Sequence, residues 1–260
     1  MKTLPFPKKT GDIVKWGAMP GASLSYELFN LLINSDNFSL VITPDSPSAL
    51  TIEQELRFFG YQQAISHFPD WETLPYDIFS PHQDIISDRV RCLNQLLNEQ
   101  TQLLITPIST LMHFVTDIDY IANHCLTVTC GDLFDIEKIR RQLQSRGYFS
   151  VNQVAEHGEY AIRGAIIDIF PAGSTQPYRI ELFDNEVDSI RTFDPDTQLS
   201  IEKVSAINLL PAREFPLDEN SITRFRNAWR TAFTGNPMEC PIYQQVSDGF
   251  AAQGIEYYLP

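Results

Sequence analysis

The sequence of 260 residues predicts an α/β protein, in which a parallel-sheet domain is followed by an α+β domain built on an antiparallel sheet. Two observations predict this order. In the first third, apolar runs that end at a proline alternate with amphipathic segments, as in sheets whose strands are joined by helices. From residue 149 to residue 210, short apolar runs are separated by turn residues, which is typical of antiparallel strands.

The elements of the first third follow from periodicity and from helix and strand breakers. Leucines at 24, 28, 31 and 32 form one helical stripe. Pro44 ends an apolar strand, and Gly60 supplies a helix C-cap. Strands that alternate with helices imply a parallel sheet with both faces covered. In chain order we expect helix 23–33, strand 38–44, helix 46–59, strand 64–68, helix 84–98 and strand 102–107.

The character of the sequence changes near residue 125. A polar helix is expected over 135–147, with Ile136, Ile139 and Leu143 facing inward. Turn residues then separate β-rich runs, and one further helix is expected near the end of the chain. These elements are strand 160–170, strand 178–183, strand 186–193 and helix 221–233. The chain stops without a polar tail, so we expect it to be a piece of a longer protein.

Charge and composition exclude several classes of protein. The chain has 19 basic and 33 acidic residues, a net charge of −14, which disfavours tight autonomous binding of DNA or RNA. No apolar run approaches the roughly 20 residues that a membrane-spanning helix needs. No apolar segment follows the basic start, so a cytoplasmic protein is expected. The four cysteines lack CxxC spacing; although His124, Cys125 and Cys130 lie close together, we expect buried or partly buried free thiols and no metal.

A glycine-containing turn precedes the first helix, where an α/β nucleotide-binding protein carries its P-loop. That loop has the pattern G-x-x-x-x-G-K-[ST]. With Gly17 as its first glycine, Ala22 replaces the second glycine, Ser23 the lysine, and Leu24 the hydroxyl residue that holds Mg²⁺. Without the lysine the loop lacks the main positive charge for a triphosphate. The turn, which includes Gly21, is therefore either a simple helix cap or a degenerate nucleotide loop.

Two other segments carry groups with possible chemistry. In the aromatic stretch 70–89, a hydrolase would use His82 with either Asp84 or Asp77, but the stretch supplies no nucleophile at a defined spacing. A surface loop that packs its own aromatic residues is the alternative. The second segment is a set of acidic residues that would either bind a cation or lie on a solvated strand edge and block unwanted pairing. The spacing of a calcium-binding loop is absent, which favours the strand-edge interpretation. This set is Asp184, Glu186, Asp188, Asp194 and Asp196.

The strand at 178–183 predicts a protein-binding surface. Period-two alternation places Ile180 and Leu182 on one face and Arg179, Glu181 and Phe183 on the other. If the aliphatic pair faces the core, Phe183 points outward beside Arg179, and Arg163 of the preceding strand adds to the patch. An exposed aromatic ring beside arginine is the composition of a binding hot spot. The alternative is that a helix of the same domain covers Phe183.

Five stretches together resemble the amino-terminal region of the bacterial transcription-repair coupling factors. They are WETLPYD at 71–77, SPHQDIIS at 80–87, EHGEYAIRGAIIDIFP at 156–171, PYRIELFD at 177–184 and LLPAREFP at 209–216. The related excision-nuclease subunit UvrB shares this arrangement but has an intact P-loop, which the present turn lacks. The resemblance runs from about residue 15 to the end of the chain.

The resemblance implies three domains: a degenerate P-loop, RecA/helicase-like domain 1a (1–124), an α+β domain 2 that docks the damage-sensing subunit UvrA (125–211), and the start of a truncated domain 1b (212–260). It implies that the contacts to UvrA carry over onto Arg163, Arg179 and Phe183. The whole protein would be an ATP-driven DNA translocase that removes stalled RNA polymerase. The sites for ATP, Mg²⁺, RNA polymerase and double-stranded DNA would lie outside this chain. The chain itself would mimic UvrB and would have no cofactor, no catalytic activity and no membrane contact. The alternative is an active P-loop NTPase or helicase module of excision repair.

Overall fold

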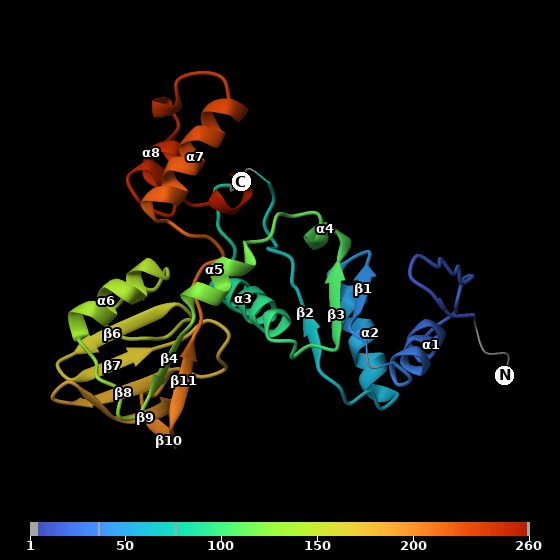
Figure 1. The fold of residues 1–260 in the computed structure, drawn as a ribbon, viewed down its shortest axis with the longest axis horizontal. Coiled ribbons are helices and arrows are strands. Elements are labelled where there is room, and N and C mark those ends of the chain that lie inside the picture. The colour runs from blue at the N-terminus through green and yellow to red at the C-terminus, as the bar shows by residue number, and fades with distance from the viewer. Residues whose placement is uncertain (1–4, 36, 76, 259–260) are drawn as a thin grey trace. The chain divides into compact units, whose positions relative to one another are not determined.

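The computed structural model describes residues 5–35, 37–75 and 77–258 (Figure 1). Contacts between residues divide the chain into two compact units. The first comprises Met1–Asp70 and Asn98–Met112, and the second comprises Trp71–Leu97 and His113–Pro260. The three domain ranges expected from the sequence remain a prediction. Among the described residues, no helix combines the length and the apolar character that crossing a bilayer demands.

The first unit is built on a small parallel sheet. Its strands β1 (Ser39–Thr43), β3 (Leu103–Pro107) and β2 (Ile65–His67) lie in the order β1-β3-β2. Helices α1 (Ser23–Leu32) and α2 (Ser46–Phe58) supply Leu32, Ala49 and Leu56 to a core with Leu103 and Ile105, and the short α4 (Ile108–Leu111) follows β3. The parallel sheet expected from the sequence is confirmed. Covering of both faces is wrong for β1, because the core packs on the side of Val41 and leaves Leu40 and Ile42 exposed.

Local signals explain the limits of α2. The Asp45 carboxylate accepts a hydrogen bond from the Ser48 amide at 2.8 Å, which caps the first turn. Pro47 follows in that first turn, where its missing N–H costs nothing. After the helix, Gly60 adopts a φ of 98°, a left-handed conformation that glycine takes without strain.

The second unit contains a six-stranded sheet in the order β10-β9-β8-β7-β6-β5. All neighbours are antiparallel except β5 and β6, which are parallel. A separate antiparallel pair joins β4 to β11. The strands are β4 (Leu126–Thr129), β5 (Phe149–Ser150), β6 (Glu159–Arg163), β7 (Ile166–Ile169), β8 (Tyr178–Phe183), β9 (Glu186–Phe193), β10 (Ser200–Val204) and β11 (Ala206–Leu209). The antiparallel α+β architecture predicted for this part is confirmed.

One face of this sheet packs against helix α6 (Ile136–Ser145). Ile139 and Leu143 of α6 share a buried cluster with Ile167 of β7 and with Ile180 and Leu182 of β8. Asp135 begins the helix by accepting hydrogen bonds from the amides of Glu137 and Lys138. We call the sheet face opposite α6 the outer face.

The segment 160–170, expected as one strand, is a hairpin. Gly164 lies between β6 and β7 with a φ of 61°, and residues 164 and 165 form the turn. A glycine with positive φ reverses the chain without steric cost, but apolar residues resume directly after Gly164, so the segment resembles one continuous apolar run. The reversal pairs Ala161 with Asp168, so the carboxylate lies on the strand next to that of Arg163.

A buried ion pair joins α3 (Gln83–Leu97) to the segment that follows β11. Arg89 of α3 is fully buried and donates to Glu214 from Nε to Oε1 at 2.5 Å and from Nη2 to Oε2 at 3.0 Å. Trp71 Nε1 donates to the same Oε1 at 3.1 Å. The other elements are α5 (Ile118–His124), α7 (Glu219–Ala232), η1 (Pro237–Glu239), α8 (Pro241–Ser247) and η2 (Ile255–Tyr258).

The four cysteines are free thiols. Cys92 is buried, and Cys125 and Cys240 are partly buried, as expected from the sequence. Cys130 is exposed, so the expectation is wrong at that position; the residue lies in the turn that follows β4, outside the core.

Candidate functional site

Strand β8 presents Phe183 to solvent on the outer face. The two aliphatic residues of the strand, Ile180 and Leu182, are buried in the cluster with α6, as the alternation predicts. The side chain of Phe183 therefore points the opposite way, and the residue is 73% exposed. The alternative that a helix of the domain covers this ring is wrong, because α6 packs on the other face.

A tight turn holds Phe183 at the end of β8. Phe183 pairs with Glu186 of β9, and only Asp184 and Asn185 lie between them. Asp184 adopts a φ of 52°, a left-handed conformation that aspartate tolerates better than most residues. Since the turn is short and paired on both sides, the position of the ring is set by the sheet.

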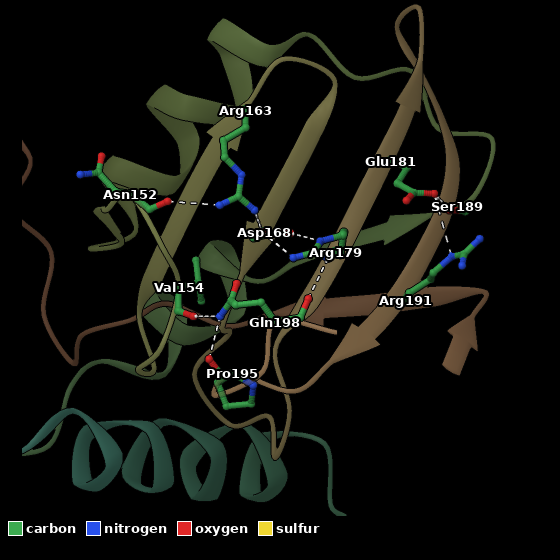
Figure 2. Close-up of polar contacts among 10 residues, drawn as sticks. All are labelled: Asn152, Val154, Arg163, Asp168, Arg179, Glu181, Ser189, Arg191, Pro195 and Gln198. Atoms are coloured by element: carbon green, nitrogen blue, oxygen red, sulfur yellow. Dashed lines mark hydrogen bonds and ion pairs between the residues drawn. The ribbon is translucent and has the colours of Figure 1, made fainter. Parts of the chain in front are cut away.

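The two arginines of the predicted site meet at one buried carboxylate. Figure 2 shows Arg163 of β6 and Arg179 of β8 converging on Asp168 of β7, which lies between them. Arg179 donates from Nε to Oδ1 at 2.7 Å and from Nη2 to Oδ2 at 3.0 Å. Arg163 also donates to Oδ2 through Nη2. The hydrogen bonds from Arg179 to Asp168 raise the pKa of Arg179 above its ordinary value.

The surroundings make the two arginines different. Arg179 also donates to the Gln198 carbonyl at 3.1 Å and lies 4.9 Å above the centre of the Phe193 ring, so its side chain is only 16% exposed. Arg163 donates to the Asn152 carbonyl at 3.2 Å, and its side chain is 47% exposed. More of the Arg163 side chain is therefore accessible to solvent, whereas Arg179 is held within the outer face.

Further charged groups extend this layer across the sheet. Glu181 accepts a hydrogen bond from the Ser189 hydroxyl at 2.6 Å, and Arg191 Nε lies 3.9 Å from the same carboxylate oxygen (Figure 2). Sequence reasoning missed Asp168 and Arg191. The signal for Asp168 was an acidic residue inside an apolar run, but it required knowing that β6 and β7 form a hairpin.

Asp194, one of the five residues of the acidic set, stabilises a local turn. Asp194 Oδ1 accepts from the amides of Asp196 at 3.0 Å and Thr197 at 2.7 Å, and the Thr197 bond is the main reason that the pKa of Asp194 is lowered. Within the described residues, no three histidine, cysteine or acidic side chains gather in a way that would hold a metal ion.

The histidine and acid of the segment 70–89 are also tied into the structure. Asp84 accepts from His157 Nδ1 at 2.6 Å and lies 3.4 Å from His82. His157 Nε2 faces the Ser174 backbone carbonyl at 2.8 Å, where a hydrolase would need a nucleophilic hydroxyl. This geometry joins the segment to the six-stranded sheet's domain and gives no support to a hydrolase.

The five residues of the glycine turn lie together at the start of α1. The Ser23 hydroxyl donates to the Pro20 carbonyl at 2.7 Å, and Gly21 adopts a φ of 55°. Residues 12–20 form no strand, although a P-loop connects a strand to a helix. The P-loop fold expected for this region is therefore not confirmed, and nucleotide binding by Gly17, Gly21, Ala22, Ser23 and Leu24 remains a separate question.

The region that carries this surface matches a known protein family. Residues 126–215 match the UvrB interaction domain, a range that includes β4 to β11 and all the outer-face residues described above. The chain is 46% identical over 244 residues to the transcription-repair-coupling factor of Haemophilus influenzae, and 44% identical over 254 residues to that of Escherichia coli. These alignments cover 93% and 98% of the chain.

The chain is similar to the amino-terminal region of transcription-repair-coupling factors. The resemblance expected from the sequence motifs is confirmed. A further relative, the transcription-repair-coupling factor of Rickettsia prowazekii, is 29% identical over 92% of the chain. The chain spans only about a fifth of the length of these transcription-repair-coupling factors, since the alignments cover 21%, 22% and 21% of them.

Proposed function

We propose that this chain is the UvrA-recruiting region of a transcription-repair coupling factor. The outer face of its UvrB interaction domain docks UvrA, the damage-sensing subunit of the excision nuclease, by presenting a surface like that of UvrB. The observation that carries the proposal is the 73% exposure of Phe183 at a fixed position of the sheet, within the matched range. Aromatic side chains and arginines are enriched among the residues that carry most of the energy of protein interfaces, and Phe183 stands on the same face as Arg179.

The surrounding charges suit a directional contact. The Phe183 ring would enter an apolar pocket of UvrA, and burying such a side chain contributes about 1.5–3 kcal/mol. Arg163, whose side chain is 47% exposed, would pair with a carboxylate of the partner and fix the orientation. Asp168 keeps both arginines in place before the partner arrives, so little side-chain entropy is lost on binding.

The activities of the whole protein are assigned to other domains. In this proposal, ATP hydrolysis, translocation on DNA and displacement of RNA polymerase belong to parts of the polypeptide outside this chain. The chain itself has no catalytic role and links polymerase displacement to excision repair by recruiting UvrA. The altered glycine turn supports this division, because Ser23 occupies the place of the P-loop lysine.

A competition experiment tests the proposal of mimicry. Purified UvrA is first loaded with UvrB, and the chain is then added in increasing amounts. We expect the chain to displace UvrB in proportion to its concentration, since both would occupy one surface of UvrA. A stable complex that contains UvrA, UvrB and the chain together would show two separate surfaces and contradict the proposal.

A further inference from the structure

A row of three exposed residues crosses the end of the six-stranded sheet. Phe183 of β8 pairs with Glu186 of β9, and Glu186 forms a β-bridge to Leu133 on its other side. Residues paired in this way point to the same face of a sheet. Glu186 is exposed, and Leu133 is 83% exposed, more than Phe183 itself.

The neighbours of these residues confirm which way the row points. Leu182, Val187 and Phe134 each adjoin one member of the row in sequence, and all three are buried in the cluster with α6. Because side chains alternate between faces, the residues of the row lie together on the outer face. Sequence alternation within β8 alone does not reveal Leu133, which belongs to a segment 50 positions earlier in the chain.

Leu133 is held in place by its backbone. The Gly131 amide donates to the Val187 carbonyl at 2.8 Å, and the Val187 amide donates to the Asp132 carbonyl at 2.9 Å. On the other side, the Phe134 amide donates to the Asn185 carbonyl at 2.6 Å. These backbone hydrogen bonds tie the segment of Leu133 to β9 and to the turn after Phe183, so little backbone entropy is lost when a partner binds there.

Charge adds a specific feature between the two apolar side chains. Neighbouring strands are about 4.8 Å apart, so Phe183 and Leu133 lie roughly 10 Å from one another with the carboxylate of Glu186 between them. Among the residues that the structure describes, no lysine, arginine or histidine forms an ion pair with Glu186. A single exposed apolar residue is ordinary on a protein surface, but two at backbone positions fixed by strand pairing, with a carboxylate between them, form a pattern that a partner can recognise.

We propose that Leu133, Glu186 and Phe183 form one recognition row, with Leu133 as a second apolar anchor of the docking surface. The inference rests on the proposed function and concerns the same partner. The complementary surface would have two apolar pockets, one for the ring and one for the leucine, with a lysine or arginine between them. Along β8 the same face carries Arg179, Glu181 and Phe183 in turn, so the row lies at one end of the charged layer described above.

Dissociation constants for purified UvrA test the row. We expect Leu133→Ala to weaken binding by about tenfold, and Glu186→Gln to weaken it while reducing its dependence on salt. Leu199→Ala is the matched control: Leu199 is 68% exposed in the same domain, outside the row, and its truncation should leave binding unchanged. Far-UV circular dichroism would verify that each variant is folded.

The outcomes separate this inference from the proposed function. If Phe183→Ala weakens binding strongly while Leu133→Ala and Glu186→Gln bind as the wild type does, the row is wrong and UvrA docking stands. If Phe183→Ala also binds as the wild type does, the proposed docking surface itself is wrong. Equal weakening by Leu133→Ala and Leu199→Ala would mean that the loss comes from general apolar contact, which also contradicts the row.

Discussion

Asp168 holds Arg179 in a two-point contact, with Nε 2.7 Å from Oδ1 and Nη2 3.0 Å from Oδ2. The carboxylate is fully buried, and the same group also receives Arg163 from the opposite neighbouring strand. Asp168 thus sets the positions of both arginine side chains. The sequence pattern alone predicts only that Arg163 and Arg179 belong to one surface patch.

The substitution Asp168→Asn should destabilise the domain. The amide nitrogen of the new side chain would face a guanidinium group and could not accept its hydrogen bond, leaving a partly buried charge unpaired. We expect the free energy of unfolding in urea to fall by about 2–3 kcal/mol. Glu181→Gln is the control, with an expected loss below about 1 kcal/mol, because the carboxylate of Glu181 is partly exposed and the amide oxygen that replaces it still accepts from Ser189. Equal losses for the two variants would contradict this role of Asp168.

The buried pair of Arg89 and Glu214 should respond differently to single and double replacement. Arg89→Met leaves the Glu214 carboxylate buried without its main partner, and we expect a loss of about 3–5 kcal/mol of unfolding free energy. Adding Glu214→Leu removes the orphaned charge and should restore much of that loss. If the double variant is instead less stable than Arg89→Met, the two losses are independent. That result would show that the unpaired Glu214 carboxylate does not cause the loss in Arg89→Met.

The cap of α7 predicts a dependence of stability on pH. Asp218 accepts from the Ser221 amide at 2.8 Å, and this bond lowers the pKa of Asp218 below its ordinary 3.8. A lowered pKa stabilises the folded state at neutral pH, and the contribution is lost as the pH falls from about 3.8 through the folded-state value. We expect Asp218→Ala to cost about 1 kcal/mol at pH 7 and progressively less in acid.

Asp218→Asn separates capping from charge. Asparagine caps a helix without ionising. The Asp218→Asn variant should therefore unfold at the same urea concentration as the wild type at pH 7, and the stabilisation by its cap should persist in acid. A constant difference between the wild type and Asp218→Ala across the acidic range would contradict the titration of Asp218.

The glycine turn predicts that nucleotide does not bind. Ser23 stands where the P-loop lysine would reach the phosphates, and its hydroxyl donates to Pro20 within the turn. Titration of the chain with Mg·ATP in a calorimeter should show no saturable heat up to millimolar concentration. Micromolar affinity would instead favour the alternative of an active NTPase module.

Local patterns predicted most elements of the fold. The proline after β1, the cap at Asp45 and the glycine at 60 are short-range signals, and the corresponding strand and helices form within one or two residues of the expected limits. The hairpin at Gly164 was missed because apolar residues lie on both sides of a turn of only two residues, so β6 and β7 resemble one long apolar run. The exposure of Leu40 and Ile42 was missed because local periodicity does not show which faces find a covering helix.

The candidate site was predictable only in part. Alternation in β8 predicts that Phe183 faces away from the core, and this geometry is confirmed. It does not predict that Asp168 occupies the arginines, or that Gln198 and Phe193 cover Arg179, because these contacts join strands through tertiary pairing. Leu133 was missed for the same reason: its bridge to Glu186 links segments far apart in the chain.

The most direct test of the docking proposal compares two phenylalanines. Phe149 on β5 is 54% exposed in the same domain, and β6 and β7 separate its strand from β8, so Phe149→Ala serves as a matched control for Phe183→Ala. The dissociation constant of each variant for purified UvrA is measured against the wild type. We expect Phe183→Ala to weaken binding by about thirtyfold or more, and Phe149→Ala to leave it unchanged. Wild-type affinity in a folded Phe183→Ala variant would contradict the account.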